Sequence, residues 1–177
     1  MEVDGWLADP QVRTRHARDI DGTPAEVMAA ARSLPVDDLG LMGRLVRWRI
    51  PHLPSDVTFE GLLNTQPFTV LAQGPHHHLA GLAGRIWDLR RDYARLADPE
   101  AFRSWSEPGT VRVLIAARAE AHHAGAARLI VESRVEPVDR KAAMRLRILW
   151  AAIGRFEGLI GSEALAAVQA QRAARSG

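Results

Sequence analysis

The sequence predicts an α+β domain in which short helices and one long C-terminal helix pack against an antiparallel sheet. Two observations carry this prediction. Short runs of alternating apolar and polar residues are separated by turn residues, which is typical of antiparallel strands. A long segment near the C-terminus instead repeats its apolar residues at helical spacing. With 177 residues, of which 47% are hydrophobic and 25% charged, the chain suits one domain spanning residues 1–177.

The first strand is predicted at residues 11–20, where apolar and polar side chains alternate. A helix follows, because Thr23 and Glu26 have the spacing of a capping box and Pro24 suits the first helical position. We expect this helix to end near Ser33.

A second short helix is predicted from an aspartate cap at residues 37–38 to the residue before Pro51. Extended runs are predicted at 57–63, 68–73 and 78–87, with turns between them. Residues 88–110 then form an excursion between two strands, with a short helix from Pro99 to Trp105.

Two longer strands are predicted at 110–121 and 127–136. If Ile115 lies opposite Val131, the apolar side chains of both strands share one covered face. We expect the other face to be solvated and to carry the charged side chains of Arg112, Arg118, Arg128, Glu132 and Arg134.

The last segment, about 139–175, is predicted to be helical, with a bend or break at the glycines between 154 and 162. Its apolar stripe is expected to face the sheet. The stripe consists of Met144, Ile148, Ala151 or Ala152, Phe156, Leu159, Ile160, Leu165 and Val168.

Composition narrows the class of protein. The net charge of only +2 gives little support for nucleic-acid binding, although the pI is near 9.9. The absence of cysteine excludes disulfides and thiolate chemistry. No run reaches the roughly 20 apolar residues of a membrane span. We expect a cytoplasmic monomer or homodimer, with a flexible N-terminus at 1–10 and a frayed C-terminus at 170–177.

The order of elements resembles the helix-grip fold of the START-like, or SRPBCC, superfamily, which includes polyketide cyclases, aromatase-like proteins and Bet v 1 allergens. The segment "DIDGTPAEVMAAARSL" is similar to the early part of bacterial members. "GLAGRIW", "ADPEAFRSWSEPGTVRV" and "LIVESRVEPVDRKAAMRLRILWAAI" resemble later parts of actinobacterial ones. The resemblance implies a curved sheet wrapped around the long helix and a cavity for an apolar or aromatic ligand. It carries over no catalytic residues.

We expect the cavity to be lined mainly by apolar side chains, with Ser133 as the main polar group. Such a lining favours binding over catalysis, which needs a positioned acid or base. No cofactor is expected, and catalytic residues are not assigned. The expected lining residues are Trp48, Ile86, Tyr93, Trp105, Val113, Ile115, Val131, Ser133, Ile148 and Phe156.

Three functions remain open: a binding protein for a small apolar ligand, a polyketide cyclase or aromatase-type enzyme, and a regulatory or stress-associated interaction module. The arginines of the second helix and the basic residues 140–147 are interpreted as a solvated face, with phosphate or lipid headgroup contact as the alternative.

Five of the seven histidines fall in two clusters, 76–78 and 122–123. We expect both to lie at the same end of the sheet as exposed turn residues. A resident metal is not expected, and His76, His78 and His122 are the candidates for adventitious binding.

Overall fold

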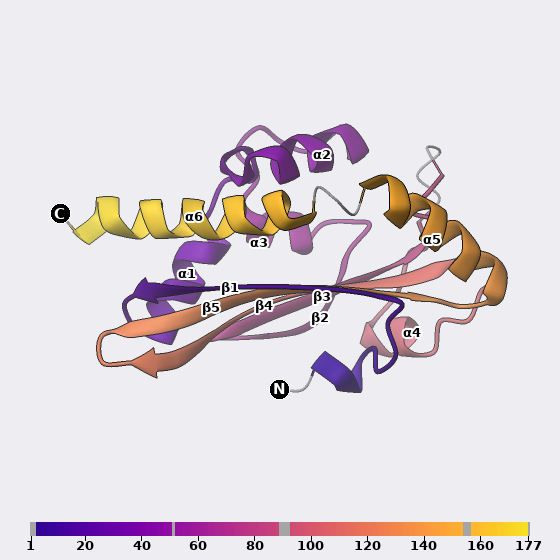
Figure 1. Ribbon diagram of the computed structural model, residues 1–177, viewed down its shortest axis with the longest axis horizontal. Coiled ribbons are helices and arrows are strands. Elements are labelled where there is room, and N and C mark those ends of the chain that lie inside the picture. The colour runs from indigo at the N-terminus through magenta and orange to yellow at the C-terminus, as the bar shows by residue number, and fades with distance from the viewer. Residues whose placement is uncertain (1–2, 51, 89–92, 154–156, 177) are drawn as a thin grey trace.

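The fold is a five-stranded antiparallel sheet in the order β1-β5-β4-β3-β2, with helices packed on it (Figure 1). The computed structural model describes residues 3–50, 52–88, 93–153 and 157–176. The strands are β1 Val12–Asp21, β2 Thr69–Gly74, β3 His77–Gly84, β4 Val111–His123 and β5 Ala126–Pro137. The helices are the 3-10 helices η1 Val3–Gly5 and η2 Val36–Leu39, and the α-helices α1 Pro24–Arg32, α2 Leu41–Arg49, α3 Phe59–Leu63, α4 Pro99–Arg103, α5 Arg140–Ile153 and α6 Glu157–Ser176.

The predicted strands at 11–20, 68–73, 78–87, 110–121 and 127–136 are confirmed as β1 to β5, with boundaries shifted by a few residues. The capping box at the start of α1 is also confirmed. The amide of Glu26 donates to Thr23 Oγ1 at 3.3 Å, and the amide of Thr23 donates to Glu26 Oε2 at 2.9 Å. This reciprocal pair satisfies two amides that the first turn of a helix leaves free.

Two local predictions are wrong. Residues 57–63 were expected to be extended, but Thr58 caps α3 by accepting a hydrogen bond from the amide of Gly61 at 3.1 Å. Threonine favours both strands and helix caps, so the apolar residues after it do not decide between them. The second helix begins as η2, and α2 follows only after Gly40, whose φ is +59°.

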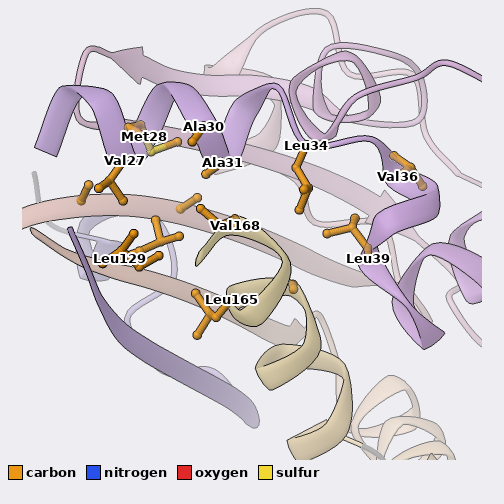
Figure 2. Close-up of a cluster of buried hydrophobic side chains, with 14 of the residues drawn as sticks. Val27, Met28, Ala30, Ala31, Leu34, Val36, Leu39, Leu129, Leu165 and Val168 are labelled. Atoms are coloured by element: carbon orange, nitrogen blue, oxygen red, sulfur yellow. The ribbon is translucent and has the colours of Figure 1, made fainter. Parts of the chain in front are cut away.

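The face of the sheet that carries α1, α5 and α6 is called the inner face. At one end, α1 and α6 lie side by side over β1, β4 and β5 and enclose an apolar cluster that includes Met28, Leu129 and Leu165 (Figure 2). At the other end, Ala142 and Leu146 of α5 pack on the sheet. The inner face is therefore covered by different helices at its two ends.

The opposite, outer face was expected to be solvated, and this is wrong where the N-terminal segment and α4 cover β2, β3 and β4. Leu7 is 1% exposed there, and Phe102 is fully buried in a cluster with Leu79 and Leu114. Residues 1–10 were expected to be flexible; within them, Val3 and Leu7 pack against the sheet.

Glu132 and Arg134 face the outer side, as predicted, but they are 1% and 2% exposed. Arg134 Nε donates to Glu132 Oε1 at 2.6 Å, and its Nη1 donates to the carbonyl of Leu7 at 2.6 Å. Arg13 and Asp4 complete the network, at 2.9 Å from Glu132 and 2.6 Å from Arg134. The hydrogen bond from Arg134 holds the pKa of Asp4 below its usual value. This network ties the N-terminal segment to the sheet.

The described parts of the C-terminal segment are the helices α5 and α6, and the predicted bend or break at 154–162 falls in part on residues 154–156, which lie outside the described residues. The predicted packing side is wrong for α5. Met144 and Ile148 are 63% and 67% exposed, whereas Ala142 and Leu146 are buried. The reason is that α5 has apolar residues on two opposite sides, so periodicity alone does not identify the packed one. Among the described residues, no helix is both long and apolar enough to cross a membrane.

Candidate functional site

The middle of the inner face is the region between the two apolar clusters. A row of five paired residues crosses the sheet there: Thr14, Ser133, Ile115, Ala80 and Val70. The predicted pairing of Ile115 with Val131 is wrong, since Ile115 pairs with Ser133. Because the error is two residues, an even number, every side chain keeps its predicted face.

This central row combines apolar surface with two hydroxyl groups. Thr14 Oγ1 and Ser133 Oγ lie 2.6 Å apart, and either can donate to the other. Ser133 and Ile115 are only half-buried, as are Val113 and Val131, which follow on either side of the row and pack against the two end clusters. Strand residues at the centre of a helix-covered sheet face are normally buried completely. The half-buried side chains therefore leave apolar surface available for contact.

His78 lies one row further along the inner face, beside Ala117 of β4 and Gln73 of β2. It is fully buried, and neither ring nitrogen has a hydrogen-bond partner in the described part of the chain. Burial lowers the pKa of His78, with the nearby charge of Arg32 acting in the same direction. The imidazole is accordingly held neutral, with one nitrogen able to accept a proton.

A polar cluster borders His78 where α1 and α3 meet the β2–β3 turn. Arg32 donates through Nη2 to the carbonyl of His77 at 2.8 Å and to that of Gly74. Gln73 Nε2 donates to Glu60 Oε1 at 2.6 Å, and Arg32 Nε lies 3.9 Å from the same oxygen. These contacts fix the helices over this edge of the sheet, and they place a charged pair near the neutral imidazole.

The structure brings together only part of the predicted lining. Val113, Ile115, Val131 and Ser133 share the inner face on adjacent strands, as expected. Ile86 packs with the cluster beneath α5.

The other predicted lining residues lie elsewhere. Trp105 packs with the cluster on the outer face, where it also borders a hollow of about 230 Å³. Tyr93 is half-buried and pairs with Gly84 through a backbone bridge. Trp48 and Ile148 are 61% and 67% exposed. Phe156 lies outside the described residues. The described lining therefore comes from the sheet rather than from the excursion at 88–110 or from α2.

Sequence reasoning missed Thr14 and His78. Thr14 lies on an alternating strand, so its face could have been assigned from Ile20, but its pairing with Ser133 depends on the β1–β5 register. His78 was predicted to begin the strand at 78–87 and to be exposed; it does lie in β3, but it is fully buried.

The two histidine clusters lie at the same end of the sheet, since β3 begins at His77 and β4 ends at His123. His76 and His122 are exposed. Among the described residues, Asp19, His122 and His123 place ligand atoms within 4.8 Å of one another. Arg128 already lies there, donating to Asp19 Oδ1 at 2.7 Å and lying 2.7 Å from His122 Nε2. The guanidinium of Arg128 thus contacts two of these three side chains.

No protein-family model and no curated protein matches this chain. Two solved structures are similar to it. One is a crystal structure of a protein from Thermus thermophilus, with 12% identity and a TM-score of 0.36, covering 94% of this chain and 100% of that one. The other is a hypothetical protein from Helicobacter pylori, with 10% identity and a TM-score of 0.41, covering 96% of this chain and 94% of that one. At these TM-scores, neither likeness carries an argument about function.

Proposed function

We propose that the protein has a START-like helix-grip fold and binds a small hydrophobic or aromatic ligand on the inner face of its sheet. One observation carries the proposal: Ile115 remains half-buried between the two packed ends of the sheet face, and Val113 and Val131, which pack against the clusters at those ends, are also only half-buried. Covering these side chains with an apolar ligand would remove their remaining surface from water, at about 25 cal/mol per Å².

The hydroxyl pair gives the proposed site a polar contact. Without a ligand, Thr14 and Ser133 satisfy each other at 2.6 Å. Because each hydroxyl has one donor and two acceptor positions, the pair can also bond to a ligand oxygen without losing its own hydrogen bond. The preferred ligand is therefore a mainly apolar molecule with one hydroxyl or carbonyl group.

A fluorescent apolar probe, N-phenyl-1-naphthylamine, tests this proposal. We expect the wild-type protein to enhance its fluorescence and Ser133→Phe to abolish the enhancement, because the larger side chain would cover the half-buried surface of the central row. Ala17→Phe is the matched control, since Ala17 is exposed on the other face of β1. Absence of enhancement in the wild type, or equal enhancement in both variants, would contradict the proposal and favour an interaction module.

A polyketide cyclase or aromatase-type enzyme is the second candidate, and His78 favours it. A buried imidazole of lowered pKa is unprotonated at neutral pH and suits a general base. Incubation with a poly-β-carbonyl compound would separate the two functions. An enzyme should change the distribution of cyclised products, and His78→Gln should restore the spontaneous distribution without weakening probe binding.

A further inference from the structure

Helix α5 carries an apolar stripe that faces solvent. Met144 and Ile148 are 63% and 67% exposed, which makes them, with Trp48, the large apolar side chains most exposed in the described part of the chain. Ala151 continues the stripe one turn later and is also exposed. Ala142 and Leu146 anchor the opposite side of the helix to the sheet. The sheet therefore fixes α5 with its second apolar side outward.

Cations flank this stripe on both sides. At about 100° per residue, Arg140 and Arg147 fall on one side of Met144 and Ile148, while Lys141 and Arg145 fall on the other. These are all the charged residues of α5, whose sequence RKAAMRLRILWAAI contains no acidic residue.

The flanking side chains remain available to a partner. Arg140, Lys141 and Arg147 are exposed, and none of them takes part in an ion pair among the described residues. Arg145 is exposed as well, with its guanidinium 5.8 Å from the ring of Trp87. The positive charge of α5 is thus not neutralised by ion pairs within the described fold.

We propose that α5 docks the protein on an anionic lipid bilayer, with Met144 and Ile148 inserted among the acyl chains and the basic residues at the headgroups. A helix lying in a membrane interface has an apolar strip bordered by lysine and arginine, whose long side chains reach up to the phosphates. A second copy of the chain fits less well, because two α5 helices packed face to face would bring like charges together. The inference does not depend on the proposed ligand site.

Vesicle co-sedimentation with the full chain tests the proposal. We expect binding to vesicles of phosphatidylglycerol and phosphatidylcholine, at least tenfold weaker binding to phosphatidylcholine alone, and weaker binding as salt rises above about 0.1 M. Met144→Ser/Ile148→Ser should weaken binding by about tenfold for each side chain. The matched control is Ala166→Ser/Ala170→Ser, an exposed pair at the same spacing on α6.

A second pair of variants tests the contribution of the basic side chains of α5 to vesicle binding. Arg140→Glu/Arg147→Glu should abolish binding to the anionic vesicles. Arg15→Glu/Arg95→Glu makes the same change in net charge at exposed positions outside α5, and this variant should retain most of the vesicle binding.

Circular dichroism should show that each variant folds, because all the substituted side chains are exposed. Three results would overturn the proposal. The first is equal vesicle binding by Met144→Ser/Ile148→Ser and its control, and the second is an equal loss of vesicle binding in the two charge-reversal variants. The third is a wild-type protein that does not bind vesicles but forms a dimer, when Met144→Ser/Ile148→Ser is monomeric. The last result would assign the stripe to a second copy of the chain.

Discussion

Replacing Glu132 with methionine is expected to lower the free energy of unfolding by about 3–5 kcal/mol, because it leaves a buried cation without its buried carboxylate partner. Arg134 is 2% exposed and donates to Glu132 at 2.6 Å. It keeps Asp4 at 2.6 Å, but Asp4 is 69% exposed and therefore compensates less. We place the expected loss at the lower end of the range, about 3 kcal/mol.

The partner substitution distinguishes pairing from packing. Arg134→Met leaves Glu132 with Arg13 at 2.9 Å and Arg118 at 3.7 Å, so the expected loss is about 1.5–3 kcal/mol. The double variant Glu132→Met/Arg134→Met should recover to within about 1.5 kcal/mol of the wild type, since apolar side chains of similar volume then fill the site.

Urea unfolding at pH 7, followed by tryptophan fluorescence, measures these losses. The control is Glu100→Gln, which removes an exposed ion pair with Arg103 at 3.0 Å and should cost less than about 1 kcal/mol. If Glu132→Met costs no more than this control, the pair is solvated and the N-terminal segment does not seal the outer face. A loss in the double variant equal to the sum of the single losses would refute the pairing argument.

Three further predictions concern single positions. His78→Gln should reduce the rise in the free energy of unfolding as the pH increases through about 6.5. Burial lowers the folded-state pKa of His78 below the unfolded value of about 6.5, so protonation favours the unfolded chain; an unchanged dependence of stability on pH, measured by urea unfolding, would count against burial of a neutral ring. Gly81→Ala places a Cβ 2.6 Å from the fully buried Phe102 ring and should lower the free energy of unfolding by about 1–3 kcal/mol. An unchanged melting temperature would mean that the packing of Phe102 on Gly81 is loose. Thr23→Ala removes the acceptor for the amide of Glu26 and should cost about 1 kcal/mol by urea unfolding; an effect below about 0.3 kcal/mol would show that the capping box contributes little.

The elements predicted from local signals agree best with the structure. The capping box at Thr23 and the alternation along β4 and β5 depend on neighbouring residues only, and both were predicted. The shared face of Ile115 and Ser133 was also predicted, because even-numbered errors in register preserve the face.

The predictions that failed depend on what covers a surface. Glu132 and Arg134 were placed on the correct face, but only the packing of Leu7 against that face shows that they are buried. Helix α5 has two apolar sides, and the packing of Ala142 and Leu146 in one buried cluster with side chains of the sheet decides which side faces the sheet. Tertiary contacts of this kind leave no signature in the spacing of residues.

Native mass spectrometry of the protein purified from its own host is the most direct test of a ligand site on the inner face. Wild-type protein should retain a small apolar molecule, seen as an added mass that is released on unfolding, and Ser133→Phe should carry no added mass. Wild-type protein that is always empty, or an equal added mass in Ser133→Phe, would contradict a ligand site at the centre of the inner face.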